Sequence, residues 1–296
     1  ATTEIYTLSL HDALPISSMA ENTNRFQAKA RVLPLTRTYV MGILNVTPDS
    51  FSDGGRFLDP EHALARAWEM VQEGVDIIDV GGQSTRPGYT CVSPAEEWAR
   101  IKDVLPRLKD MAGPLVSVDT FYPQVAQWAL EAGADVINDV SGFGDEMLRA
   151  VAGSGCGCVV MHPRGALEGD ILGEVRAFFE ERLNAAHRLG ISQERVCLDP
   201  GIGFGKTLED NLRLIANVGA TRIPGVAYLM AASRKRVTGA PCGNPPFEER
   251  LPATLAAHTA AILGGADLVR VHDVKEAVQA ARMADALQGR CALPPT

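Results

Sequence analysis

The sequence has no apolar run long enough to cross a membrane, for which about 18 residues are needed. It also has no basic surplus, since 28 Lys and Arg against 36 Asp and Glu give a net charge of −8. Nucleic-acid binding over a wide surface needs a basic surplus or stripe, because phosphate contacts require positive partners. These absences exclude membrane spans and general nucleic-acid binding, and they still allow a compact basic pocket.

Cysteines are few and have no paired spacing of the kind that binds zinc. The six are Cys91, Cys156, Cys158, Cys197, Cys242 and Cys291. Cys156 and Cys158 are one residue too close for a redox CxxC motif, and both Cys158 and Cys197 lie in apolar runs. We therefore expect buried, reduced thiols in a cytoplasmic protein.

The first residues of the chain do not resemble a signal peptide. Residues 1–18 have no basic start, and His11 and Asp12 interrupt their apolar stretch. We expect them to be a non-native leader, such as a translated cloning scar, with Met19 as the native start. Residues 19–38 are then a polar N-terminal lead, and residues 289–296 a C-terminal tail.

Between residues 39 and 288, short apolar runs alternate eight times with helical patterns. The expected strands are Tyr39–Leu44, Ile77–Val80, Leu115–Val118, Val136–Ile137, Cys158–Met161, Val196–Leu198, Val226–Ala231 and Leu268–Val271. The expected helices are Pro60–Glu73, Pro94–Lys109, Pro123–Ala132, Glu146–Ala152, Glu174–Leu189, Leu208–Asn217, Glu248–Leu263 and Lys275–Leu287. Eight βα units without a second zone of composition predict an α/β protein, a single-domain (β/α)8 TIM barrel.

Polar residues stand at or just beyond the ends of the expected strands. They are Asn45, Asp79, Asp119, Asn138 with Asp139, His162, Asp199, Lys235 after Ser233-Arg234, and Arg270 with His272. In a barrel these ends meet at one rim, where the loops that form binding sites also lie. Asn45 alone is compatible with an ordinary turn, and Asp139 alone with a helix N-cap. Polar groups on all eight strands together favour a site.

The rim residues fall into two chemical groups. Two carboxylates, an amide and an ammonium group suit a flat heterocycle with ring N–H donors and a carbonyl acceptor: Asp119, Asn138, Asp199 and Lys235. Arg270 and His272 alternate on one strand and therefore point to the same side, and Arg86 with the hydroxyls of Ser84 and Thr85 can join them. This second group predicts an anion site, which barrels often have near strands seven and eight.

These residues stand in motifs that resemble the dihydropteroate synthase family, the folate-pathway enzymes that sulfonamide drugs target. The resemblance covers about Tyr39 to Leu287. Its motifs are Met41–Gly55 (MGILNVTPDSFSDGG), Asp79–Gly82, Ser84–Gly88 (STRPG), Ser117–Thr120, Ile137–Asp139, Val160–His162, Leu198–Lys206 (LDPGIGFGK), Ser233–Lys235 and Arg270–Asp273. It implies a transferase that joins 6-hydroxymethyl-7,8-dihydropterin diphosphate to 4-aminobenzoate, giving dihydropteroate and diphosphate. It also implies Mg²⁺, small-molecule partners only, and a homodimer formed through the late helices.

The resemblance assigns a role to each site residue. It places the pterin on Asp119, Asn138, Asp199 and Lys235, and the diphosphate on Asn45, Thr85, Arg86, Arg270 and His272. It places 4-aminobenzoate on Phe51, Pro87, Ser233 and Lys235, and Mg²⁺ on Asn45. The residues expected to act in catalysis are Asp119, Asp199, Lys235, Arg270 and His272. The loops Val46–Leu58 and Gln83–Val92 are expected to close over the amine.

Two departures from the family pattern stand beside this interpretation. Gln83 occupies a position where the family usually has glutamate, and His162-Pro163-Arg164-Gly165 differs from the usual run after strand five.

Two other functions also remain open. A pterin-dependent methyltransferase barrel, which passes a methyl group from a reduced folate to a corrinoid protein, would have no use for Arg270 and His272. A non-catalytic pterin-binding protein would not need the complete first loop.

Overall fold

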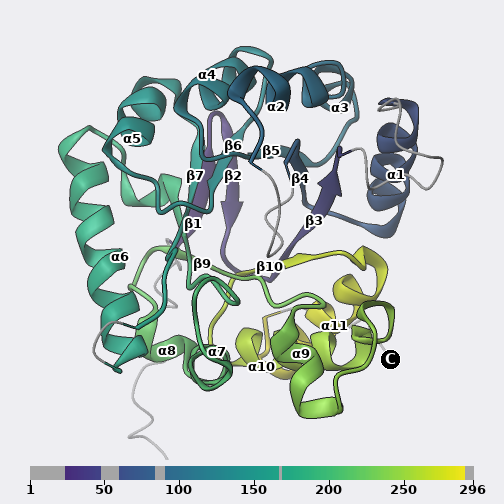
Figure 1. Cartoon of the computed structure of the whole chain (residues 1–296), viewed down its shortest axis with the longest axis vertical. Helices are drawn as coiled ribbons and strands as arrows, with labels where there is room; N and C mark the ends of the chain where they lie inside the picture. The colour runs from purple at the N-terminus through teal and green to yellow at the C-terminus, as the bar shows by residue number, and fades with distance from the viewer. Residues whose placement is uncertain (1–23, 48–59, 84–90, 167–168, 291–296) are drawn as a thin grey trace, which may run out of the picture.

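The computed structural model describes residues 24–47, 60–83, 91–166 and 169–290, and within them eight parallel strands close into a barrel. The barrel strands are β3 (Tyr39–Asn45), β4 (Ile77–Gly81), β5 (Leu115–Asp119), β6 (Val136–Asp139), β7 (Gly157–Met161), β8 (Val196–Asp199), β9 (Ala227–Met230) and β10 (Leu268–Val271). The strands follow one another around the barrel in chain order, and β10 closes it by pairing with β3. The predicted (β/α)8 barrel is confirmed (Figure 1).

Helices connect successive strands and surround the barrel (Figure 1). They are α1 (Pro60–Glu73), α2 (Pro94–Ile101), α3 (Leu105–Lys109), α4 (Pro123–Glu131), α5 (Asp145–Val151), α6 (Ile171–Arg188), α7 (Leu208–Ala216), α8 (Val218–Thr221), α9 (Arg236–Gly239), α10 (Leu251–Leu263) and α11 (Val274–Leu287). The predicted helix from Pro94 to Lys109 is two helices, because the chain turns between Ile101 and Leu105. Ser93 caps α2, accepting a hydrogen bond from the Glu96 N–H.

A β-hairpin closes one end of the barrel, within the lead to which the sequence analysis assigned no element. Strands β1 (Arg25–Ala28) and β2 (Arg31–Pro34) pair antiparallel, and β1 packs against β7 and β8. Phe26 is fully buried there, and a Cβ at Gly157 would lie 2.5 Å from its ring. The absent side chain at Gly157 therefore makes room for Phe26 in the barrel floor.

The apolar core has two parts, one inside the barrel and one between barrel and helices. Strands β4 and β5 are buried at every position, as expected for parallel strands covered on both faces. The inner part joins Phe26 of the hairpin to the lower strand residues Met41, Ile77, Leu115 and Leu268. A rigid lower barrel thus supports the polar upper ends of the same strands.

Two further sequence expectations can be compared with the described residues. Cys156, Cys158 and Cys197 are buried free thiols, as expected, whereas the free thiols of Cys91 and Cys242 are exposed. Of the helices in the described ranges, none is both long enough and apolar enough to span a membrane.

Candidate active site

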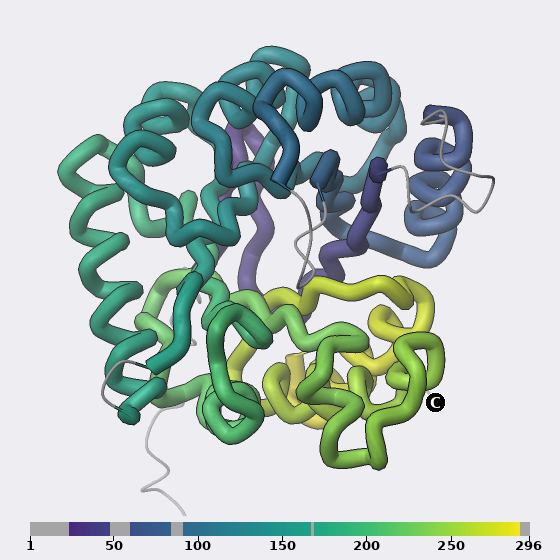
Figure 2. The backbone as a smooth tube through the Cα atoms, viewed as in Figure 1, coloured from purple at the N-terminus to yellow at the C-terminus, as the bar shows by residue number. Residues whose placement is uncertain are grey.

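The strand pairing brings the predicted polar residues together at one mouth of the barrel. Asn45 is level with Gly81, Gly81 with Asp119, and Asp119 with Asn138 on successive strands. Figure 2 follows the chain once around the barrel, so that the last strand, β10, lies beside the first, β3. Residues far apart in sequence therefore line one site.

Arg270 lies at the centre of a buried ion-pair network. Its Nε donates to Asp79 Oδ2 at 2.7 Å, and its Nη2 donates to Asp119 Oδ2 at 2.9 Å. The Asn138 side-chain amide also donates to Asp79 Oδ2, at 3.0 Å. From the sequence, Asp79 is expected at a strand end and has no predicted role in the site. In the structure it connects Arg270 to Asn138.

This network differs from the separation into two groups that the sequence suggested. Arg270 was assigned to the anion group, but it contacts the carboxylate of Asp119, a member of the heterocycle group. The guanidinium can do both because its five donors point in several directions, and its Nη1 makes no hydrogen bond to any described residue. The two groups therefore share Arg270.

Burial governs the protonation of this network. It raises the pKa of the Asp119 carboxyl to about 7, with Asp79 and Asp139 adding to the rise while Arg270 and Lys235 oppose it. The pKa of Arg270 is raised by its carboxylate partners despite burial, so its charge is fixed. Because Arg270 always keeps its charge, Asp119 is the member of this pair whose charge depends on pH.

A second polar cluster joins β8 to the turn that follows β9. The Asp199 carboxylate accepts the Gly201 N–H at 2.7 Å, and burial raises its pKa against the nearby charge of Lys235. The Lys235 ammonium donates to the Ile202 carbonyl at 2.6 Å and lies 5.0 Å from the centre of the Phe204 ring. Burial lowers the pKa of Lys235 to about 8. The cluster thus places a carboxylate acceptor near an ammonium donor.

Lys206 is a further cation at the mouth, and it has no predicted role in the site. Its ammonium donates to the carbonyls of His162 and Phe204, at 3.1 and 3.2 Å, and so links the loops after β7 and β8. Burial lowers its pKa to about 7, with Asp199 opposing the change. In the sequence, Lys206 is marked only as the last residue of the motif Leu198–Lys206.

Two buried oxygens at the mouth have no partner among the described residues. They are Oδ1 of Asn138 and Oδ1 of Asp79, and both belong to side chains that are already fixed by the Asp79–Asn138 hydrogen bond. A buried acceptor without a partner costs free energy unless a ligand or water supplies an N–H or O–H donor. These two oxygens can therefore accept hydrogen bonds from a ligand that has N–H or O–H groups.

His272 and Ser233 meet at the same rim, as the sequence predicts for neighbouring strands. The Ser233 hydroxyl and His272 Nδ1 are 2.9 Å apart, and the His272 backbone N–H also donates to this hydroxyl, at 3.2 Å. Phe247 packs edge-on against the His272 ring, with centroids 5.4 Å apart. These contacts orient the imidazole beside Arg270.

Asn45 is the residue predicted to hold Mg²⁺. Its side chain makes no hydrogen bond to any described residue, and Gly81, level with it on β4, leaves the space beside its amide oxygen open. Within the described ranges no three His, Cys, Asp or Glu residues gather as a metal cluster. A single neutral oxygen ligand fits Mg²⁺, which is commonly bound through few protein groups, water and substrate phosphates.

Four predicted site residues lie outside the described part of the chain: Phe51, Thr85, Arg86 and Pro87. Most of both predicted loops lies outside it too. Gln83, at one end of the second loop, is buried, and its side-chain oxygen accepts the Val92 N–H from the other end at 2.9 Å. Gln83 therefore joins the two ends of this loop.

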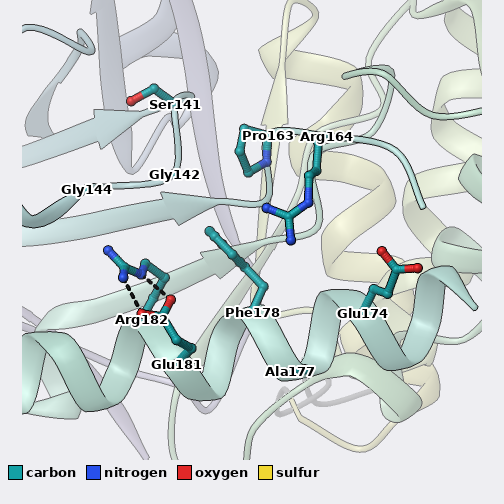
Figure 3. A pocket seen from close by; sticks show the side chains of 10 residues that line it. All are labelled: Ser141, Gly142, Gly144, Pro163, Arg164, Glu174, Ala177, Phe178, Glu181 and Arg182. Atoms are coloured by element: carbon teal, nitrogen blue, oxygen red, sulfur yellow. Dashed lines mark hydrogen bonds and ion pairs between the residues drawn. The ribbon is translucent and has the colours of Figure 1, made fainter. Parts of the chain in front are cut away.

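A separate groove of about 590 Å³ lies between the loops after β6 and β7 and helix α6 (Figure 3). Arg164 and the Phe178 ring line it, and Arg182 pairs there with Glu181 and Asp145. The His162 ring is buried behind it, edge-on to Phe178, and burial lowers its pKa to about 4. None of the predicted site residues lines this groove, so the mouth is the candidate active site.

Comparison with known proteins shows the family to which this chain is similar. Residues 41–272 match the family model of pterin binding enzymes. The dihydropteroate synthase of Synechocystis is 44% identical over an alignment of 261 positions, which covers 85% of this chain and 90% of that protein. The residues that match the family model, 41–272, include every strand end at the mouth.

Solved structures of two further relatives superpose over most of the chain. The dihydropteroate synthase of Xanthomonas albilineans with 4-aminobenzoic acid is 42% identical, with a TM-score of 0.85 over 92% of this chain and 99% of that one. The same protein with 7,8-dihydropteroate gives a TM-score of 0.82. The Yersinia pestis enzyme in complex with a sulfonamide drug is 36% identical, with a TM-score of 0.82 over 90% of this chain and 99% of that one.

Proposed function

The chain belongs to the dihydropteroate synthase family of pterin binding enzymes, and from this we propose the reaction and the residues that perform it. The proposed reaction joins 6-hydroxymethyl-7,8-dihydropterin diphosphate to 4-aminobenzoate and releases diphosphate. The main support is the buried mouth cluster of Asp119, Asn138, Asp199 and Lys235 around Arg270. Its acceptors and donors match those of a pterin ring.

Pterin recognition follows from the geometry of the two polar clusters. The pterin edge has amino and ring N–H donors next to a carbonyl oxygen, so a carboxylate beside an ammonium group is complementary to it. Asp199 and Lys235 provide that pair. The unpartnered Oδ1 of Asn138, with the Asp119 carboxylate, would accept the remaining N–H groups. Asp79 acts indirectly, because it orients both Asn138 and Arg270.

The diphosphate would lie on the side of Arg270 opposite to the pterin. Nη1 of Arg270 and the His272 ring from β10 would bind it, with Asn45 at the neighbouring end of β3 and with Thr85 and Arg86 of the second loop. Asn45 would hold Mg²⁺ together with the diphosphate. When bound, this ion supplies positive charge that stabilises the leaving group.

The reaction needs charge stabilisation more than proton transfer. Loss of diphosphate leaves a cation delocalised over the reduced pterin, and the negative charges of Asp119 and Asp199, both buried at the mouth, would stabilise it. Arg270 and His272 stabilise the departing anion. The 4-aminobenzoate nitrogen would be bound by Phe51, Pro87, Ser233 and Lys235. It is nucleophilic when neutral, so no protein nucleophile is required. Its attack on the cation forms the C–N bond, and the proton that the nitrogen then loses can pass to the released diphosphate or to water.

We also propose that the enzyme is a cytoplasmic homodimer. Large apolar side chains are exposed on three late helices that pack together: Leu208 and Leu212 on α7, Leu263 on α10, and Met283 and Leu287 on α11. Exposed apolar groups that gather on neighbouring helices are typical of contact surfaces. Light scattering should give twice the mass of the chain, and the mass of a single chain would exclude the dimer.

Growth complementation tests the proposed function. A bacterial strain that lacks its own dihydropteroate synthase should grow without added folate end products when it expresses this chain, and a sulfonamide should reduce that growth. The Asp119→Ala variant should not restore growth, because the pterin loses a buried carboxylate partner. Normal growth with Asp119→Ala, or none with the wild type at matched expression, would contradict the proposal.

A further inference from the structure

Helix α2 has a buried acid that no part of the proposed reaction uses. Glu97 is fully buried, whereas its neighbour Glu96 is exposed and pairs with Arg100. A buried carboxylate normally has a cationic partner, but the second amino group of Arg100 is bound to the Gly82 carbonyl, at 2.9 Å. Glu97 therefore makes no ion pair with any described residue.

Glu97 instead contacts the residue that follows Asp119. The Thr120 hydroxyl donates to Glu97 Oε2 at 3.2 Å and accepts the Tyr122 N–H at 3.1 Å. The Thr120 backbone N–H donates to the Asn138 carbonyl at 3.0 Å. Thr120 thus connects the backbones of two pterin residues, Asp119 and Asn138, and Glu97 fixes its side chain.

The surroundings of Glu97 favour the neutral acid. Its Oε1 is buried and has no hydrogen-bond partner among the described residues. An ionised oxygen in that position would cost far more free energy than a neutral one. Burial raises the pKa of Glu97 to about 8, and the charge of Asp119 on β5 adds to the rise, while Thr120 and Arg100 oppose it.

The same helix also packs against the strand that holds Asp79. A Cβ at Gly82, directly after β4, would lie 2.8 Å from the Glu97 carbonyl oxygen, so helix and strand end are in direct contact. Helix α2 therefore touches the ends of β4 and β5 together. The carboxylates of these two strands, Asp79 and Asp119, are the pair that Arg270 bridges.

We infer that Glu97 is a positioning residue for the pterin pocket, acting as a neutral acid that holds Thr120 and thereby sets the Asp119 carboxylate against Arg270. The inference rests on the proposed function for the identity of the ligand. If Glu97 were ionised, it would add a negative charge next to Asp119. The repulsion between the two carboxylates would then disturb the ion pair of Asp119 with Arg270. Pterin affinity, more than the chemical step, should therefore depend on Glu97.

Calorimetric binding of 6-hydroxymethylpterin to the full chain at pH 7 and pH 9, together with kcat and KM, tests this. Glu97→Ala should weaken pterin binding about tenfold, a loss near 1.4 kcal/mol, and raise KM similarly while kcat changes less than about threefold. Glu97→Gln, which keeps a neutral group of the same shape, should bind within about threefold of the wild type at pH 7. It should also lose less affinity than the wild type between pH 7 and pH 9.

Two further variants keep the result interpretable. Glu96→Gln, on the exposed side of the same helix, is the matched control and should change nothing. Thr120→Val removes the same hydrogen bond without altering α2, and we expect it to weaken pterin binding as much as Glu97→Ala does. It replaces Glu97→Ala in the comparison if Glu97→Ala folds poorly. The inference is overturned if Glu97→Gln loses as much affinity as Glu97→Ala at pH 7, or if Thr120→Val binds pterin like the wild type. Pterin binding without turnover in the wild type would overturn the proposed reaction alone, because the Glu97 comparison is measured by binding.

Discussion

Arg270 is the residue on which the proposed site depends most. Its Nε and Nη2 neutralise Asp79 and Asp119, both buried, and removing one partner from such a network leaves an uncompensated charge. The sequence predicts the chemical types of these side chains and their places at strand ends. It does not predict which of them pair, because the contacts between guanidinium and carboxylate atoms depend on side-chain conformations.

The pH dependence of pterin binding should reflect the charge of Asp119. Because burial raises its pKa to about 7, the carboxyl is ionised above that pH and protonated below it. A protonated carboxyl accepts N–H groups poorly and weakens the pair with Arg270, so affinity should fall up to about tenfold per pH unit below pH 7. Calorimetry between pH 5 and pH 8 measures this. A flat profile in the wild type, or the same slope in Asp119→Asn, would show that another group is responsible.

Gln83 offers a second prediction at the residue scale. We expect a glutamate here to accept the Val92 N–H as Gln83 does, and to add a negative charge that competes with phosphate for Arg86. Gln83→Glu should therefore raise the KM for the pterin diphosphate about two- to tenfold without changing thermal stability by more than a few degrees. Steady-state kinetics decides this, and an unchanged KM would refute the competition.

Among the elements, the eight barrel strands were largely predictable and the hairpin was not. Apolar runs bounded by glycine and proline located every barrel strand within about two residues, because buried parallel strands have this composition. Strands β1 and β2 are short and mostly exposed, apart from Phe26 and Ala28. Their stability comes from contact with the barrel floor, which no local pattern reveals. The break between α2 and α3 differs from the single helix predicted over Pro94–Lys109. It comes just before Pro106, which is tolerated in the first turn of a helix and disfavoured in the interior.

The hairpin should contribute stability and leave the chemistry unchanged. Phe26→Ala removes a fully buried ring from the barrel floor and should lower the free energy of unfolding by about 3–5 kcal/mol, with kcat within about twofold of the wild type. Urea denaturation followed by circular dichroism measures the change. Val32→Ala, at a half-exposed position of β2, is the matched control and should cost less than about 1 kcal/mol. A stable Phe26→Ala protein with reduced kcat would contradict this division of roles.

At the scale of the whole molecule, a negatively charged protein binds a substrate with a diphosphate group. The net charge of −8 is compatible with this, because three of the 28 Lys and Arg residues lie together at the mouth, beside its carboxylates: Lys206, Lys235 and Arg270. A closed barrel makes this grouping possible, since it brings the ends of all its strands to one place.

Removal of Mg²⁺ should impair the diphosphate side of the mouth and leave the pterin side unaffected. Chelation should reduce turnover at least about a hundredfold, because the leaving diphosphate loses its counter-ion. Binding of 6-hydroxymethylpterin, which has no diphosphate, should stay within about twofold by calorimetry. If chelation abolished pterin binding, the metal would have to be bound among the pterin residues, which would contradict its assignment to Asn45.

The most direct test of the whole account is a product measurement with the purified chain. It should be supplied with 6-hydroxymethyl-7,8-dihydropterin diphosphate, 4-aminobenzoate and Mg²⁺, and dihydropteroate and diphosphate should be quantified together. We predict equal amounts of both products, and none when 4-aminobenzoate is replaced by benzoate, which has no amine. Absence of dihydropteroate from a folded protein that binds pterin would contradict the proposed reaction and favour a pterin-binding protein of another kind.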